Sequence, residues 1–172
     1  QLSQQSLLAE RLRAVEERMK QTFQYMHELL KQLAVLKPQN PRLFSIPGVA
    51  DLRDLGFQES FIDYRKTRIG EMDVFELISF YVKWAGGGRI ELQRDMPWPA
   101  QKIRDALFAT STKFQEEEVR SARGTVTGWK FLVEPAVVTD ITVRADHAQG
   151  RLMIRGKNLL RLGIHDFAVP AE

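Results

Sequence analysis

The three histidines are the side chains best suited to bind a metal ion or transfer protons in this chain, which contains no cysteine. His147 follows Asp146 and His165 precedes Asp166, so each of these imidazoles has a carboxylate next to it in sequence. Adjacent residues on a β-strand point to opposite faces, so neither pair can share one metal ion in the usual way. His27 falls on the outer side of a predicted helix. We therefore expect no metal site and no cofactor.

A group of basic residues near the C-terminus could bind an anion. The segment from Arg120 to His165 contains eight basic residues and three acidic ones. Strand periodicity places four of the basic residues on one face of a predicted hairpin, namely Arg144, Arg151, Arg155 and Lys157. This face is interpreted either as solvated surface or as an anion-binding surface. It lacks aromatic side chains that could stack on bases, which argues against single-stranded nucleic acid as the ligand.

Two other patterns could take part in anion binding or acid–base catalysis, but each also has a purely structural explanation. Residues 86–89 (GGGR) could offer backbone N–H groups to an anion, or could let one element end and the chain reverse into the next. Residues 116–118 are three glutamates with no second acid at a defined distance, so they do not indicate general acid–base catalysis. The motifs HExxH, GxSxG and the P-loop do not occur. An enzyme is therefore our third choice of function, and we predict no catalytic residues.

The longest predicted element is a helix over residues 3–36, which Lys37-Pro38 should end because the residue before proline is disfavoured in the α region. Its apolar residues recur at alternating spacings of four and three, which is typical of a coiled coil. These heptad residues, here called the heptad seam, are Leu8, Leu12, Val15, Met19, Met26, Leu29, Leu33 and Leu36.

Two interpretations of this helix stay open. It either self-associates as a dimer to tetramer, in parallel if Arg11 pairs with Glu16 of a neighbour, or folds back on its own domain. Phe23, Tyr25 and Leu30 widen the apolar stripe in its second half. The wider stripe indicates either additional helices in the bundle or a docked domain. We favour self-association.

Residues 38–42 form a short polar linker, and residues 43–172 predict one α+β domain with a mostly antiparallel sheet and two or three helices. We expect a helical turn at residues 51–55 and a helix from Trp98 to about Arg123. We also prefer a buried helix over residues 73–88, because Asp73 and Glu76 resemble a capping box. A strand over residues 74–85 remains the alternative, since periodicity alone cannot assign an apolar run of this length.

The remaining segments show the alternation of strands. Residues 57–69 and 89–95 read as two strands, and from Gly124 the apolar period changes to two. We expect an antiparallel meander there, with strands near residues 129–133, 141–145, 151–155 and 162–169, and with one face buried.

Composition limits the classes of function. Of the 172 residues, 44% are apolar and 27% are charged, which is ordinary for a globular chain. The absence of cysteine excludes disulfides and thiolate zinc sites and fits a cytoplasmic location. No apolar run approaches the roughly 20 residues that span a bilayer. The sequence starts at Gln1 rather than Met, so an upstream signal or anchor stays open.

Together these patterns predict a non-enzymatic, homo-oligomeric binding or scaffolding protein assembled through its N-terminal coiled coil, with itself and another protein as partners. The alternative is a protein that binds nucleic acid or another anionic ligand on the basic sheet face. The net charge of +3 is too small to indicate by itself that the protein binds nucleic acid.

Overall fold

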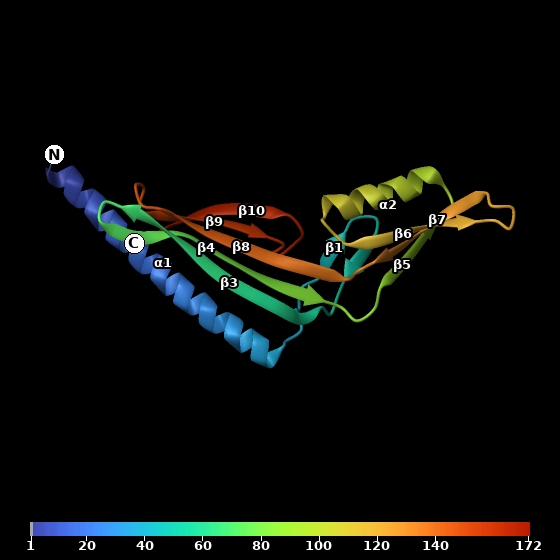
Figure 1. The fold of residues 1–172 in the computed structure, drawn as a ribbon, viewed down its shortest axis with the longest axis horizontal. Coiled ribbons are helices and arrows are strands. Elements are labelled where there is room, and N and C mark those ends of the chain that lie inside the picture. The colour runs from blue at the N-terminus through green and yellow to red at the C-terminus, as the bar shows by residue number, and fades with distance from the viewer. Residues whose placement is uncertain (1) are drawn as a thin grey trace.

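A computed structural model describes residues 2–172 as one long helix followed by a sheet-rich domain (Figure 1). The elements in chain order are α1 (Leu2–Leu36), β1 (Phe44–Ile46), β2 (Ala50–Leu52), β3 (Gly56–Ile69), β4 (Met72–Ala85), β5 (Ile90–Arg94), α2 (Pro97–Ala109), β6 (Phe114–Arg120), β7 (Val126–Val133), β8 (Ala136–Asp146), β9 (Arg151–Lys157) and β10 (Ile164–Pro170). The α+β fold class is confirmed.

The strands of the described residues form three antiparallel sheets, which divide the molecule into two lobes (Figure 1). The large lobe consists of α1 and a five-stranded sheet in the order β10-β9-β8-β4-β3. The small lobe consists of α2, the three-stranded sheet β5-β7-β6 and the β1-β2 hairpin. The start of α1 and the C-terminus both lie toward the outer end of the large lobe in Figure 1.

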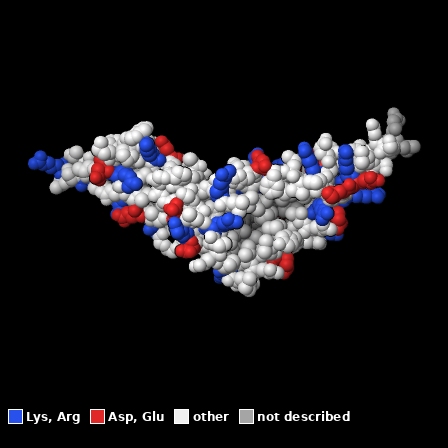
Figure 2. All heavy atoms as spheres, turned by 180° about the vertical axis from the view of Figure 1, so that it is seen from behind, with Lys and Arg blue, Asp and Glu red and all other residues white. Residues whose placement is uncertain are grey.

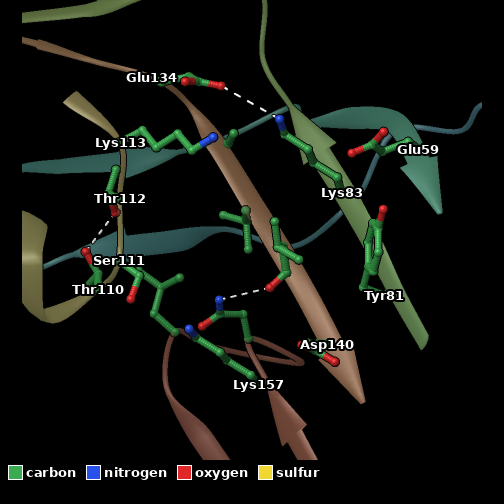
Figure 3. Close-up of a pocket in the computed structure, with 15 residues that line it drawn as sticks. Glu59, Tyr81, Lys83, Thr110, Ser111, Thr112, Lys113, Glu134, Asp140 and Lys157 are labelled. Atoms are coloured by element: carbon green, nitrogen blue, oxygen red, sulfur yellow. Dashed lines mark hydrogen bonds and ion pairs between the residues drawn. The ribbon is translucent and has the colours of Figure 1, made fainter. Parts of the chain in front are cut away.

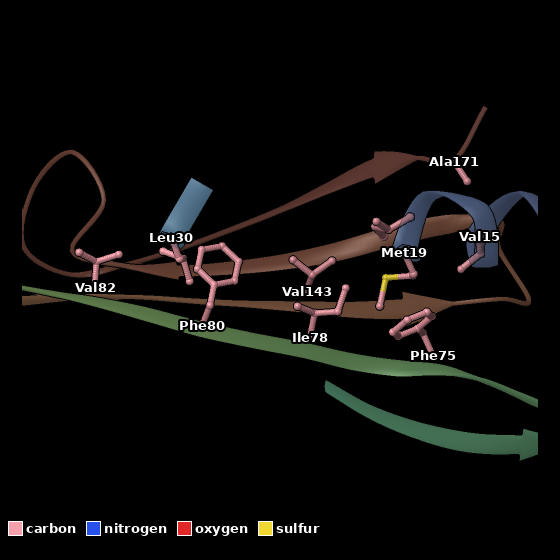
Figure 4. Close-up of a cluster of buried hydrophobic side chains, with 10 residues drawn as sticks. Val15, Met19, Leu30, Phe75, Ile78, Phe80, Val82, Val143 and Ala171 are labelled. Atoms are coloured by element: carbon pink, nitrogen blue, oxygen red, sulfur yellow. The ribbon is translucent and has the colours of Figure 1, made fainter. Parts of the chain in front are cut away.

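Helix α1 crosses one face of the five-stranded sheet and completes the core of the large lobe. Val15 and Met19 are fully buried and Leu30 is almost fully buried, among side chains of β4, β8 and β9 (Figure 4). Phe23 packs edge-on against Tyr64 of β3, with ring centroids 5.0 Å apart. Phe23 and Leu30 of the widened stripe therefore face the sheet, as in the fold-back interpretation, whereas Tyr25 is 68% exposed. Self-association through the heptad seam stays a prediction.

The second core lies in the small lobe and reaches the start of β8. It contains Phe44, Ile46, Leu52, Leu55, Ala100, Ile103, Leu107, Phe131, Val133 and Val137. Trp84, near the end of β4, contacts both cores and so connects the two lobes.

The prediction of a buried helix at residues 73–88 is wrong, because this segment forms strand β4. Its residues alternate, so that Ile78, Phe80 and Val82 pack under α1 while Leu77, Ser79 and Tyr81 point to the opposite face. β4 is paired on both sides, with β3 and β8, and its residues on the face opposite α1 are half-buried among neighbouring side chains. Apolar residues such as Leu77 and Tyr81 therefore occur on that face too, which makes the apolar run almost continuous. The capping-box pattern was misleading, because Glu76 instead forms an ion pair with Arg65.

The helix predicted from Trp98 to about Arg123 is much shorter in the structure. Helix α2 ends at Ala109, and the Thr112 N–H donates to the carbonyl of Leu107, 3.0 Å away. The chain then enters β6, so the three glutamates of residues 116–118 lie on an edge strand. Residues 51–55 contain the end of β2 instead of a helical turn, so within residues 43–172 the structure has one helix.

The strands predicted at residues 57–69 and 89–95 are confirmed as β3 and β5. The predicted C-terminal meander is also present, but it belongs to two sheets. β7 pairs with β5 and β6 in the small lobe, whereas β8, β9 and β10 pair consecutively in the large lobe. The step between the sheets occurs at Glu134-Pro135.

Candidate functional site

The four predicted anion-binding residues lie on the same face of the five-stranded sheet, the open face, opposite α1. In the β8–β9 register, Arg144 pairs with Met153, Asp146 with Arg151 and Asp140 with Lys157. Directly paired residues point to the same side, and the side chains of Val143 and Leu152 point to the other side, toward α1. The geometric part of the prediction, that these residues share a face, therefore agrees with the register.

Two of the four basic residues have a carboxylate partner on that face. Arg151 Nε lies 3.0 Å from Asp146 Oδ2, and Arg155 donates to both carboxylate oxygens of Asp166 at 2.8 and 3.1 Å. The hydrogen bond from Arg155 lowers the pKa of Asp166. Asp166 lies one residue beyond the segment in which the basic excess was counted. The surface in Figure 2 likewise has acidic and basic side chains interspersed.

Lys157 lies at a cleft formed where the two lobes meet (Figure 3). The open face of the sheet forms one wall, and the loops at residues 110–113 and 158–163 contribute the rest. The cleft has a volume of about 430 Å³ and is lined by Glu59, Tyr81, Lys83, Thr110, Ser111, Thr112, Lys113, Glu134, Ala136, Val137, Val138, Asp140, Lys157, Asn158 and Leu162.

Three lysines enter this cleft from different elements. Lys83 Nζ of β4 lies 4.0 Å from Glu134 Oε1, at the limit of an ion pair. Within residues 2–172, neither Lys113 nor Lys157 lies within ion-pair distance of a carboxylate. In Figure 3 these two side chains extend from different walls of the cleft. Two ammonium groups are thus available to a ligand.

The loop that carries Lys113 is held in place by its own hydrogen bonds. The Thr110 hydroxyl donates to the carbonyl of Ala106 at 2.9 Å and lies 2.8 Å from the Thr112 hydroxyl. The Glu134 N–H donates to the Lys113 carbonyl at 3.0 Å. Ser111 adopts a positive φ of 53°, which is uncommon for a non-glycine residue.

Asn158 fixes the loop that follows Lys157. It is buried, and its Nδ2 donates to the Val138 carbonyl at 3.0 Å while its Oδ1 accepts the Gly163 N–H at 2.9 Å. Its φ of 57° is one that asparagine tolerates better than most residues. Asn158, Lys83 and Lys113 were not predicted as site residues from the sequence, because none of them belongs to a recognisable motif.

The histidines do not converge. His147 Nε2 lies 3.2 Å from Glu16 Oε1, which also accepts the Phe75 N–H at 2.7 Å, so this pair joins α1 to the sheet. His27 is exposed and stacks on Phe23. His165 Nε2 is buried without a hydrogen-bond partner in the described structure. Among the described residues, no three histidine or acidic side chains lie together so that they could hold a metal ion.

The heptad seam is divided between the core and the surface. Val15, Met19, Met26 and Leu33 lie in the core of the large lobe or pack against it. Leu12 and Leu29 are half-buried, whereas Leu8 is 51% exposed and Leu36 is 73% exposed. Arg11 and Glu16, expected to pair between chains, have partners within the chain, since the Arg11 guanidinium donates to the Ala148 carbonyl at 3.0 Å.

The glycine run also has a structural explanation. The Gly86 N–H donates to the carbonyl of Pro135 at 2.7 Å, and a Cβ atom on Gly86 would lie 3.2 Å from the Pro135 ring. Gly86 therefore allows two chain segments to pass closely where they connect the lobes.

Comparisons with protein-family models, with curated proteins and with solved structures find no match to this chain. None of the helices in the described residues is long and apolar enough to cross a membrane. The function must therefore be argued from the geometry of the chain itself.

Proposed function

We propose that this chain is a non-enzymatic binding protein that holds a small anionic ligand in the cleft between its lobes. The observation that carries the proposal is the pair Lys113 and Lys157, which line one cleft without carboxylate partners among residues 2–172. Lys113 comes from the small lobe and Lys157 from the large lobe. A ligand bound by both would therefore bridge the lobes.

The rest of the lining indicates the chemical class of the ligand. Two ammonium groups favour a phosphate or carboxylate group, and the hydroxyls of Ser111 and Tyr81 are additional hydrogen-bond donors. Val138 and Leu162 supply apolar surface for the remainder of the ligand. A volume of about 430 Å³ is within the usual range for small-molecule sites. The carboxylates Glu59 and Asp140 would restrict the ligand to one with few negative charges or with a polar, uncharged body.

Titration calorimetry of the full chain with phosphate, citrate and adenosine monophosphate tests this proposal. We expect at least one of these probes to bind, and each of Lys113→Gln and Lys157→Gln to weaken its affinity about tenfold, since a hydrogen bond to a charged group contributes about 1.5–3 kcal/mol. Lys102→Gln is the matched control, because Lys102 is exposed on α2 and stacks over Trp98, 5.5 Å from its ring centroid.

Absence of binding by all three probes at low salt would contradict the proposal, as would equal effects of Lys102→Gln and Lys113→Gln.

Duplex DNA should be titrated in the same experiment, because the sequence also suggested that a polyanion binds the basic sheet face. Binding of DNA that is lost with Arg144→Gln and unchanged in Lys113→Gln would favour that face over the cleft.

The second candidate function is homo-oligomeric scaffolding. It is supported by the two exposed ends of the heptad seam, Leu8 and Leu36. The centre of the seam already packs on the chain's own sheet, so association through the complete seam would require α1 to leave the sheet. The anion-binding proposal does not require any such rearrangement.

A further inference from the structure

Strand β10 forms an edge of the five-stranded sheet and carries less charge than the edge strands β3, β5 and β6. β3, at the opposite edge, carries five charged residues and two register irregularities. β6 carries four charged residues among seven and one irregularity, and β5 has Glu91 and Arg94 among five. Charges and bulges of this kind prevent edge strands from pairing with other chains.

By contrast, β10 has the sequence IHDFAVP, with a single carboxylate, and pairs with β9 without an irregularity. That carboxylate, Asp166, forms an exposed ion pair with Arg155 of the same chain. The side chains are accessible, since Ile164 is 60% exposed and Phe167 is 48% exposed. β10 is therefore an open, nearly uncharged edge whose outer N–H and C=O groups can accept another strand.

We propose that β10 pairs with β10 of a second copy of this chain, in antiparallel orientation and centred on Phe167. Phe167 is the middle residue of β10, so this register places each of the seven residues opposite one of the second copy, with Ile164 opposite Pro170. Pro170 has no N–H, so only its carbonyl can take part in the ladder at the two ends. A two-fold axis perpendicular to the sheet keeps the two open faces together. Both five-stranded sheets then become one continuous sheet, with both α1 helices on the same side.

The side chains favour this register over its neighbours. Centring on Phe167 places the two Phe167 rings opposite each other and Asp166 opposite Ala168 of the second copy. Centring on Asp166 would place two carboxylates opposite each other, which is destabilising. Centring on Ala168 would leave Ile164 unpaired. The partner is therefore a second copy rather than an unrelated strand, because the strand is complementary to itself.

Because Asp166 lies opposite Ala168 of the second copy in this register, a charge introduced at residue 168 tests the proposed dimer. In the dimer, Ala168→Glu places a second carboxylate opposite Asp166 of the other copy, whereas Ala168→Lys places an ammonium group there. Sedimentation velocity of the full chain at about 1 to 200 μM covers the range in which small interfaces dissociate. We expect the unmodified protein to approach twice the chain mass of 19.8 kDa. Ala168→Glu should weaken association at least tenfold, and Ala168→Lys should strengthen it several-fold.

Gln58→Glu is the control, because it adds the same charge at an exposed position of the other edge, on β3, and should not change association. Circular dichroism melting shows whether each variant is folded; if Ala168→Glu unfolds, the comparison of Ala168→Lys with the unmodified protein still decides. A monomer at every concentration overturns the proposal. So does a dimer that responds equally to Ala168→Glu and Ala168→Lys, or one that dissociates only on Leu8→Asp in the heptad seam. The cleft lysines are unchanged in all these variants, so the outcome is independent of ligand binding.

Discussion

Arg104 and Glu116 show how single residues fix the small lobe. The Arg104 guanidinium donates to both carboxylate oxygens of Glu116 and so connects α2 to β6. This hydrogen bonding lowers the pKa of Glu116 from its ordinary value of 4.5. Both side chains are about three-quarters buried, so the pair is less exposed to solvent than a typical surface ion pair.

We expect Glu116→Gln to lower the free energy of unfolding by about 1 kcal/mol near neutral pH. Because the pKa of Glu116 is lowered in the folded state, its contribution is present above the pKa of the unfolded chain and is lost as the pH falls through the lowered value. The difference between the two proteins should therefore shrink as the pH falls below the ordinary value of 4.5 and be lost as it passes through the lowered pKa. Urea denaturation at neutral pH and at a series of acidic pH values measures this, with Glu117→Gln as the control. A difference that persists in acid would show that the ion pair is not its cause.

At the scale of elements, α1 is the helix whose partner the sequence left open. Its buried face includes Val15 and Met19, and four polar contacts hold it to the rest of the large lobe. Glu16 contacts the Phe75 N–H and His147 Nε2, Arg11 donates to the Ala148 carbonyl, and Arg18 donates to the Ala171 carbonyl at 2.8 Å. The polar residue within the seam, Thr22, donates to the Arg18 carbonyl of its own helix at 2.7 Å. The helix is therefore an integral part of the large lobe.

Met19→Ala should destabilise the large lobe by about 2–5 kcal/mol, because it leaves a cavity in a fully buried position. Leu8→Ala, at a half-exposed position of the same seam, should change the stability by less than about 0.5 kcal/mol. Denaturant unfolding at several protein concentrations measures both. If a coiled coil between chains stabilised the helix instead, Leu8→Ala would be destabilised as well, and its loss of stability would depend on protein concentration.

The heptad pattern alone suggests Met26→Asp as a test of assembly. This variant cannot distinguish a coiled coil between chains from a helix docked on its own sheet, because Met26 packs against the core of the large lobe. The double variant Leu8→Asp with Leu36→Asp is a better test, since both side chains are exposed. Light scattering on that variant tests association through the seam with little effect on the fold. An unchanged mass would exclude the seam as the interface.

At the scale of the whole molecule, the two lobes are connected where residues 86–89 and 134–135 pass each other. A Cβ atom on Gly86 would lie 3.2 Å from Pro135 and 3.3 Å from the buried Leu55, whereas one on Gly87 would meet nothing within 4 Å. The position of the cleft lysines depends on this junction, because Lys113 and Lys157 belong to different lobes.

We expect Gly86→Ala to be less stable than Gly87→Ala by about 1–3 kcal/mol, the usual range for crowding in a packed site. Comparing these two variants removes the effect that any glycine-to-alanine change has on the unfolded chain. Gly86→Ala should also weaken binding of the anion found by titration, because the lobes must shift to accommodate the methyl group. Equal melting temperatures for the two variants would show that the junction is not tightly packed.

The local patterns of the sequence were sufficient for the elements whose periodicity is unambiguous. The 3.5-residue repeat and Lys37-Pro38 predicted the long helix to its last residue, and the period-two alternation predicted β3, β5 and the strands after Gly124. They also placed Arg144, Arg151, Arg155 and Lys157 on one face, because side-chain alternation along a strand is a local property.

Only the tertiary structure decided the questions that depend on what lies next to each element. An apolar run such as residues 74–85 becomes a strand because β3 and β8 pair with it on both sides, and no local pattern contains that information. The heptad seam shows an apolar stripe but does not specify whether a second helix or the chain's own sheet covers it. The cleft is likewise formed by residues from loops and strands distant in the sequence, with Lys83, Lys113 and Lys157 each unremarkable alone. The ion pair between Arg155 and Asp166 also depends on the tertiary structure, because the two residues are neighbours only where β10 pairs with β9.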